Sequence, residues 1–147
     1  MDIRQISEGY SVAPQLEPGD MSRLAEEGVT TVICNRPDSE IPPPLQAATM
    51  QEAAERAGLA FVFNPVVGGM LTESNVEEQA EAIEASEGPV VAYCASGNRS
   101  TIVWALGMAG EIPVDEILAR ASAGGYDLGW LRPQLEALAA QRSGGGA

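Results

Sequence analysis

Cys94 and Arg99 are the two residues of this chain whose types and spacing could support nucleophilic chemistry. They enclose a short glycine-containing loop, which follows the apolar run 89–93 and precedes the apolar segment 101–106. The run predicts a buried strand, and the segment predicts a helix. Backbone N–H groups of such a loop, together with the positive N-terminus of the helix, can hold an anion and stabilise a thiolate. The pattern therefore predicts that Cys94 is a nucleophile that attacks or carries an oxyanion or a sulfur group.

The residues in and beside this loop have properties suited to holding a small anion. The planar guanidinium of Arg99 matches two oxygens of a phosphate. Gly97 lets the backbone approach the ligand, Asn98 tolerates a left-handed conformation, and Ser100 can donate a hydrogen bond to the sulfur. We expect the following residues to bind the anion besides Arg99: Ala95, Ser96, Gly97, Asn98, Ser100 and Arg36. In the alternative interpretation, Cys94 is a buried cysteine at a strand end and Arg99 faces solvent.

Composition limits the chemistry and the partners of the chain. None of the 147 residues is histidine, which excludes histidine-based acid–base catalysis, Ser-His-Asp triads and most zinc sites. The 21 acidic and 8 basic residues give a formal net charge of −13, which disfavours nucleic acid and anionic membranes as partners. We therefore expect a small anionic or phosphorylated substrate, captured locally, and neither a metal nor a cofactor.

Strands and helices alternate along the chain, which predicts one three-layer α/β domain over residues 1–142. A hydrophobic fraction of 45% with only 5% aromatic residues suits a mostly parallel central sheet flanked by helices. The expected strands cover residues 9–13, 29–35, 59–64 and 89–93, and the expected helices cover 20–27, 45–57, 72–85, 101–109, 113–121 and 131–141. Ser74 and Glu77 are expected to form the capping box of the third helix, and residues 143–147 a disordered tail.

Three loops are expected to gather at one edge of this sheet, because parallel sheets bind ligands at the carboxyl ends of their strands. They are the cysteine loop and the segments 35–38 and 64–73. Arg36 would add a second positive charge over the anion, or pair with Asp38 or Glu40. The two acids could form a catalytic pair near the cysteine, although acids in a proline-rich loop are more often solvated.

Cys34 ends the strand expected to lie beside the strand of Cys94. The two cysteines could form a disulfide that protects the nucleophile, but a buried core cysteine is the expected role of Cys34. Two distant cysteines and an N-terminus without a basic-then-apolar pattern predict a reduced, cytoplasmic protein without a membrane segment.

The segments Cys94–Ser100 and Asn35–Glu40, with Thr72-Glu73 between them, resemble the beta-lactamase-hydrolase-like phosphatase family, a protein-tyrosine-phosphatase-like domain of unknown function. The resemblance covers about residues 3–110. It implies a dual-specificity-phosphatase-like fold in which Cys94 is the nucleophile and Arg99 binds the anion.

Three features differ from the ordinary protein-tyrosine-phosphatase signature. Tyr93 stands where a histidine usually precedes the cysteine, and four residues rather than five separate Cys94 from Arg99. This shorter loop is similar in length to that of rhodanese sulfurtransferases. The general acid of such phosphatases tends to lie in the loop that corresponds to 64–73, which contains no aspartate here, so Glu73 or Asp38 would have to replace it.

The sequence as a whole predicts a thiol-dependent hydrolase of phosphatase type. Cys94 would attack phosphorus to give a phosphocysteine stabilised by Arg99 and the loop N–H groups, and water would then release the phosphate. The alternative is a rhodanese-type sulfurtransferase, in which Cys94 carries a sulfane sulfur as a persulfide and needs no strong general acid.

Overall fold

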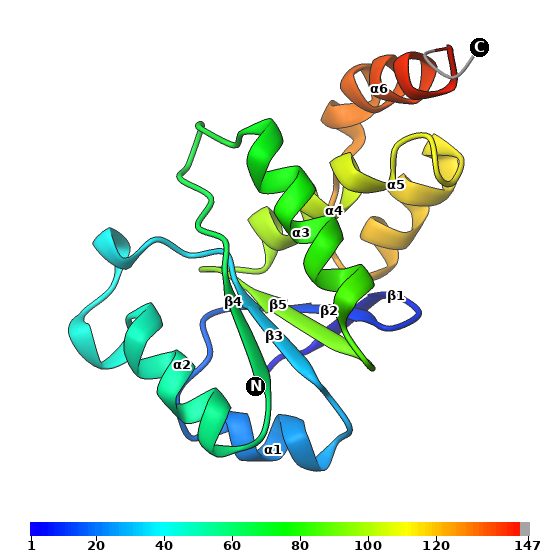
Figure 1. The fold of residues 1–147 in the computed structure, drawn as a ribbon. Helices are drawn as coiled ribbons and strands as arrows, with labels where there is room; N and C mark the ends of the chain where they lie inside the picture. The colour runs from blue at the N-terminus through cyan, green and yellow to red at the C-terminus, as the bar shows by residue number, and fades with distance from the viewer. Residues whose placement is uncertain (145–147) are drawn as a thin grey trace.

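A five-stranded sheet lies at the centre of the computed structural model, which describes residues 1–144 (Figure 1). The strands are β1 (Arg4–Ser7), β2 (Tyr10–Ala13), β3 (Thr31–Cys34), β4 (Ala60–Phe63) and β5 (Val90–Tyr93). The helices are α1 (Asp20–Glu26), α2 (Ala47–Arg56), α3 (Glu73–Ala85), α4 (Asn98–Met108), α5 (Val114–Ala123) and α6 (Arg132–Gly144). Short 3-10 turns cover Asp38–Glu40, Pro43–Leu45 and Gly129–Leu131.

The strand order is β1-β2-β5-β3-β4, and every pairing except β1 with β2 is parallel. This confirms the predicted mostly parallel α/β sheet. The sequence analysis missed β1 and took the segment of β2 as the first strand. The reason is that β1 has one buried apolar residue, Ile6, so it lacks the alternation that identifies a strand.

Helices cover both faces of the sheet, as the three-layer prediction required. One buried cluster joins Val32, Cys34 and Tyr93 to α1 and α2. The cluster on the other face joins Ile33 and Ala92 to α3, α4, α5 and α6. Figure 1 shows α1 and α2 on one side of the strands and the other four helices opposite them. No helix within residues 1–144 is long and apolar enough to cross a membrane.

Two predicted helix starts differ from the structure. Thr72, not Ser74, caps α3: its hydroxyl accepts from Asn75 N, and the Asn75 side chain accepts from Thr72 N. The prediction failed because it required a glutamate at the third helical position, and an asparagine fills that role here. Helix α4 begins at Asn98, three residues before the predicted start.

The C-terminal end of the predicted domain can also be compared with the structure. Helix α6 continues to Gly144, so Ser143 and Gly144 belong to it rather than to the expected tail. Residues 145–147, the rest of that tail, lie outside the described residues.

Candidate active site

Cys94 lies directly after the central strand β5 and is fully buried. Its N–H donates to Ala13 O at 3.3 Å, which extends the pairing of β5 with β2 by one residue. The thiol sulfur in turn accepts a hydrogen bond from the backbone N–H of Gly97 at 3.1 Å. A backbone donor at the N-terminus of α4 is thus aimed at the candidate nucleophile, which is the arrangement that stabilises a thiolate.

The loop turns sharply at Gly97, whose φ of +94° only glycine adopts without strain. The left-handed conformation expected at Asn98 is therefore found one residue earlier, and Asn98 is the first residue of α4. Its N–H donates to Ser96 Oγ at 3.2 Å, and Thr101 Oγ1 donates to Gly97 O at 2.8 Å. These local bonds hold the loop between Cys94 and Arg99 in one shape.

Ser100 does not face the sulfur in this structure. Its hydroxyl donates to Asn35 Oδ1 at 2.9 Å, and its backbone carbonyl accepts from the Tyr10 hydroxyl at 2.7 Å. The side chains of Ser100, Asn35 and Tyr10 are all buried. Ser100 thus anchors the first turn of α4 to the ends of β3 and β2, rather than donating to the thiolate as expected.

Asn35 belongs to a buried network of amides that the sequence analysis missed. Gln79 of α3 lies at its centre: its Oε1 accepts from Asn35 and from Asn64, and its Nε2 donates to Asn35 and to the Tyr10 hydroxyl. Asn75 completes the network through Asn64. The available signal was that an asparagine directly follows both β3 and β4, where a polar residue must find a buried partner.

Arg99 is held by Glu40, which comes from the loop after β3. Its Nη1 and Nη2 donate to the two carboxylate oxygens at 2.8 Å each, and Nη1 also donates to Val66 O at 2.8 Å. Arg36 donates through Nε to the same carboxylate at 3.2 Å and through Nη1 to Gln15. The structure thus brings together the three loops that the sequence predicted to meet, with Glu40 bridging two arginines.

The two donors left on Arg99 decide what it can bind. A guanidinium has five N–H donors, and three of those of Arg99 are used by Glu40 and Val66. The Nε–H and the second N–H of Nη2, side by side on one edge, donate to no residue that the structure describes. A paired edge of this kind matches two oxygens of a phosphate or carboxylate. Arg99 can therefore be positioned by Glu40 and still present a fork to an anion.

The ion pair between Arg99 and Glu40 shifts the pKa values of both residues. The Arg99 guanidinium lowers the pKa of the Glu40 carboxyl through its hydrogen bonds, with Arg36 adding to the effect and partial burial opposing it. Glu40 is therefore held as a carboxylate, which suits positioning arginine and does not suit donating a proton. The pKa of Arg99 is raised chiefly by Glu40, and nearby Cys94 contributes further.

The two candidate general acids lie differently from each other. Asp38 accepts a hydrogen bond from Ala47 N at 2.8 Å, so its carboxylate caps the start of α2. Glu73 is exposed in the first turn of α3, and none of its hydrogen bonds within the described residues reaches the cysteine loop. No carboxyl group of the described residues is hydrogen-bonded to Cys94, and none is arranged with others as a metal site.

Tyr126 contacts the cysteine loop and is absent from the candidate site residues of the sequence analysis. It follows α5, and its hydroxyl donates to Ser96 O at 2.9 Å within the cysteine loop. A Cβ placed on Gly97 would collide with this hydroxyl. No motif surrounds Tyr126, and it is 30 residues from Ser96 in the sequence, so only the fold reveals the contact.

Cys34 and Cys94 are both free and buried. The pairing of β3 with β5 places Cys34 beside Tyr93, in the cluster that faces α1 and α2. Since side chains alternate along a strand, Cys94 is turned to the opposite side of the sheet. Burial raises the pKa of the Cys34 thiol. Cys34 is thus a buried core cysteine, as the sequence analysis expected, and it forms no disulfide with Cys94 in this structure.

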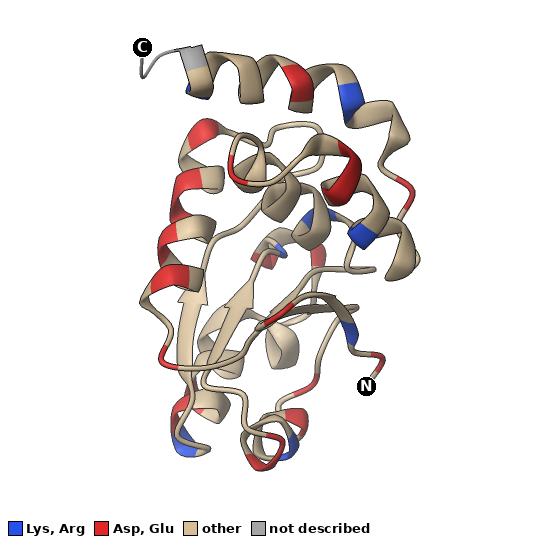
Figure 2. Cartoon of the chain, turned by 90° about the vertical axis from the view of Figure 1, so that its right-hand side faces the viewer, with Lys and Arg blue, Asp and Glu red and all other residues tan. Residues whose placement is uncertain are grey.

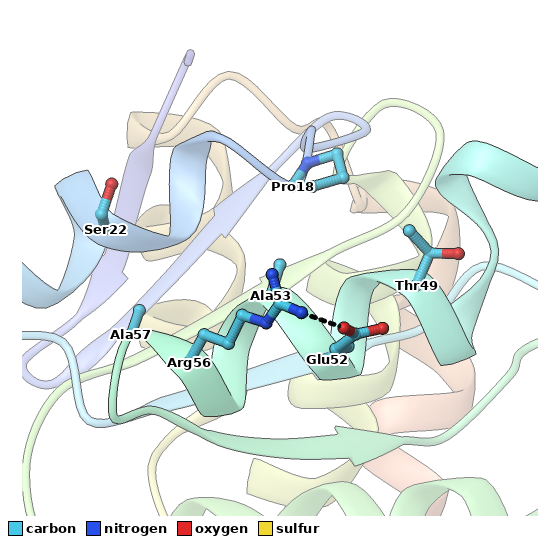
Figure 3. Close-up of a pocket in the computed structure, with 7 residues that line it drawn as sticks. All are labelled: Pro18, Ser22, Thr49, Glu52, Ala53, Arg56 and Ala57. Carbon is cyan, nitrogen blue, oxygen red and sulfur yellow. Dashed lines mark hydrogen bonds and ion pairs between the residues drawn. The ribbon is translucent and has the colours of Figure 1, made fainter.

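Two cavities lie away from the cysteine loop. Figure 3 shows the first, a groove of about 380 Å³ between α1 and α2, in which the Glu52–Arg56 ion pair lies along α2. The second, about 530 Å³, lies between α3 and α4 over the stacked rings of Tyr10 and Trp104. Neither is lined by Cys94 or Arg99, the candidate nucleophile and the candidate anion-binding residue.

Comparison with known proteins matches this chain to one family. The model of the phosphatase-like domain of beta-lactamase hydrolase-like proteins matches residues 2–111. The beta-lactamase hydrolase-like protein of Xylella fastidiosa (strain Temecula1 / ATCC 700964) is 36% identical over 140 residues, which are 91% of this chain and 32% of the relative. This chain therefore spans about a third of the length of that relative.

Solved structures show the same fold. A "putative phosphatase" from Neisseria meningitidis Z2491 superposes with a TM-score of 0.82 and 36% identity, over 94% of this chain and 99% of its own. PTPMT1 in complex with PI(5)P superposes with a TM-score of 0.77 over 100% of both chains, at 16% identity. The first similarity extends to sequence, and the second concerns the fold alone.

Proposed function

This chain belongs to the family of phosphatase-like domains of beta-lactamase hydrolase-like proteins, and from that membership we propose that it is a cysteine-dependent phosphatase for a small phosphorylated substrate. The single observation that carries the proposal is the pairing of two features in one loop. The Gly97 N–H donates to Cys94 Sγ at 3.1 Å, and Arg99, five residues after Cys94, keeps two N–H groups that donate no hydrogen bond within the described residues.

The reaction then has two displacement steps. The Cys94 thiolate attacks phosphorus, so that a P–S bond forms and the P–O bond to the leaving group breaks. Arg99 and the other loop N–H groups would bind the equatorial oxygens as their charge develops, while the Gly97 N–H donates to the sulfur. Water next attacks phosphorus, the P–S bond breaks, and inorganic phosphate and the thiolate are released.

The leaving oxygen needs a proton unless it is already a weak base. We propose Asp38 and Glu73 as the candidate donors. Asp38 Oδ1 is engaged with Ala47 N, which leaves its other oxygen to carry the proton, and Glu73 is exposed at the end of the loop whose Val66 binds Arg99. Asp38→Asn and Glu73→Gln should each be assayed with an alkyl phosphate and with an aryl phosphate. A true donor will be needed much more for the alkyl substrate, because its leaving group is more basic.

The nucleophile is tested with p-nitrophenyl phosphate and the variants Cys94→Ser and Cys34→Ser. The first should abolish hydrolysis, and acid-quenched wild-type protein should carry a phosphoryl adduct on the peptide that contains Cys94. The second is the matched control, since Cys34 is a buried core thiol on the other side of the sheet. Retention of hydrolysis by Cys94→Ser would reject the proposal.

A rhodanese-type sulfur transfer is the second candidate. Two observations favour it: the loop between Cys94 and Arg99 has four residues, and no carboxyl group of the described residues is hydrogen-bonded to Cys94. Here the Cys94 thiolate would attack the outer sulfur of thiosulfate, forming an S–S bond as the sulfur–sulfite bond breaks. The persulfide would then pass its sulfur to an acceptor thiol. The intact mass after incubation with thiosulfate or with an aryl phosphate separates the candidates, because one added sulfur and one phosphoryl group differ in mass.

A further inference from the structure

The contact between Tyr126 and the cysteine loop comes from a part of the chain beyond residues 2–111, which match the family model. Tyr126 ends the turn after α5, and its N–H donates to Ala121 O at 2.9 Å. Gly125 there has a φ of +98°, and Arg4 of β1 donates to Gly124 O at 3.1 Å. The turn is therefore held both by its own helix and by the first strand.

The Tyr126 hydroxyl reaches one particular peptide group of the loop. It donates to the carbonyl of Ser96 at 2.9 Å, and the N–H of the same peptide, that of Gly97, donates to Cys94 Sγ at 3.1 Å. A trans peptide is planar, with its C=O and N–H pointing in opposite directions. Fixing the carbonyl therefore fixes the direction of the N–H.

This peptide needs such a constraint because one of its flanking residues is glycine. Gly97 has a φ of +94°, and glycine populates positive and negative φ about equally. Rotation about Ser96 ψ and Gly97 φ would turn the N–H away from the sulfur. The Tyr126 hydroxyl lies where a Cβ of Gly97 would be, so both its close packing and its hydrogen bond oppose that rotation.

We propose that Tyr126 is a positioning residue: it clamps the Ser96–Gly97 peptide so that the Gly97 N–H stays aimed at the Cys94 sulfur. The inference deepens the proposed function, because the clamped N–H acts on the sulfur proposed as nucleophile. It would serve sulfur transfer in the same way. A hydrogen-bonded carbonyl also polarises its own peptide, which strengthens the N–H as a donor.

The test replaces Tyr126 by phenylalanine, which keeps the ring and removes only the hydroxyl. The rate of Cys94 alkylation by iodoacetamide is measured from pH 5 to 9, with peptide mass spectrometry to separate Cys94 from Cys34. In Tyr126→Phe we expect the midpoint of the pH dependence to rise and the alkylation rate at pH 6 to fall about 3- to 10-fold, the loss of one aligned donor to a charged acceptor. The kcat for p-nitrophenyl phosphate should fall in parallel.

Asp127→Asn is the matched control. Asp127 lies next to Tyr126 and accepts from Gly129 N, so the change alters the same segment without touching the cysteine loop. Its alkylation profile and kcat should equal those of the wild type. Melting temperatures of both variants report whether either change only loosens the fold.

A double-mutant cycle with Gly97→Ala gives an independent readout. The added methyl meets the Tyr126 hydroxyl, so Gly97→Ala should slow alkylation more in the wild-type background than in Tyr126→Phe, where that hydroxyl is absent. Additive effects of the two changes would overturn the clamp, as would an unshifted alkylation profile in Tyr126→Phe. If the wild type hydrolyses no phosphate ester while Tyr126→Phe still shifts the profile, the phosphatase proposal fails and the clamp stands.

Discussion

At the scale of single residues, Glu40 and Arg99 define how the site handles charge. The carboxylate occupies the outer edge of the guanidinium with two bonds of 2.8 Å and leaves the edge that includes Nε to a ligand. An arginine bound in this way cannot rotate among rotamers, so little conformational entropy remains to be lost when an anion arrives. Glu40 thus prepares the site without itself touching the reacting atoms.

Arg99→Lys tests whether the reaction needs the two parallel N–H donors of the guanidinium or only its positive charge. An ammonium group cannot make two parallel bonds to a phosphate while also satisfying both oxygens of Glu40. We expect kcat/KM for an aryl phosphate to fall. The fall should correspond to a loss of about 2–4 kcal/mol in transition-state stabilisation, which is the cost of removing one preorganised donor. Arg56→Lys, in an exposed ion pair on α2, is the control. Equal loss in both variants would mean that Arg99 has no special role.

Glu40→Gln tests the ion pair that positions Arg99, through the pH dependence of the free energy of unfolding. The pKa of Glu40 is lowered in the folded protein, so its ionised form stabilises the fold above the ordinary glutamate pKa, and this contribution is lost as the pH falls through the lowered value. Urea unfolding at several pH values should show the wild type more stable than Glu40→Gln at pH 7, with the difference vanishing in acid. A difference independent of pH would contradict the ion pair.

At the scale of elements, the site depends on contacts between parts of the fold that carry no motif. The buried amides link the ends of β3 and β4 to α3, and through Ser100 to the first turn of α4. The turn after α5 and the first strand hold Tyr126 against the loop. The local sequence from Cys94 to Arg99 can form the loop, but its neighbours decide where the loop's donors point.

Gln79→Leu tests the network at the level of stability. The substitution removes the hydrogen-bond partner of polar groups on Asn35, Asn64 and Tyr10, and all three side chains are buried. We expect a loss of about 2–4 kcal/mol in the free energy of unfolding, measured in urea. Glu81→Gln, on the exposed face of the same helix, should change it by less than about 0.5 kcal/mol. A neutral Gln79→Leu would show that the amides contribute nothing net.

Features of the fold that depend on local sequence were predictable, and most of those that depend on distant contacts were not. The parallel strands and the Cys94 loop were predictable, because continuous apolar runs and a glycine between cysteine and arginine are local signals. Strand β1 and the amide network were not, since each depends on a partner supplied by the fold. The contact from Tyr126 to Ser96 spans 30 residues and belongs to the same class. The Thr72 cap is a local signal as well, and it was missed because an asparagine replaces the expected glutamate.

At the scale of the whole molecule, the site is a small positive region on a strongly negative protein. All 8 basic residues are arginine, and Arg36 and Arg99 meet at Glu40. Exposed glutamates run along α3 (Figure 2). The net charge of −13 should repel an anionic substrate at long range, so the proposed substrate would be attracted by Arg99 only at close approach.

Ionic strength should therefore raise the efficiency of the reaction rather than lower it. Salt screens the long-range repulsion over distances beyond a Debye length of about 10 Å, while the close contacts with Arg99 are affected less. We expect kcat/KM for p-nitrophenyl phosphate to rise as sodium chloride is increased from about 10 to 150 mM. The viscosity and pH of the solutions are matched. A steady fall would show that the local arginines dominate at all distances.

The central place of β5 in the sheet has a consequence for how the protein loses activity. With β2 on one side and β3 on the other, the backbone leading to Cys94 is released for hydrogen exchange only when the whole sheet opens. The turn that carries Tyr126 is more exposed, and we expect it to open at a lower free energy. Mild denaturant would then detach the tyrosine while the cysteine stays in place, and catalysis would fade before the circular dichroism changes.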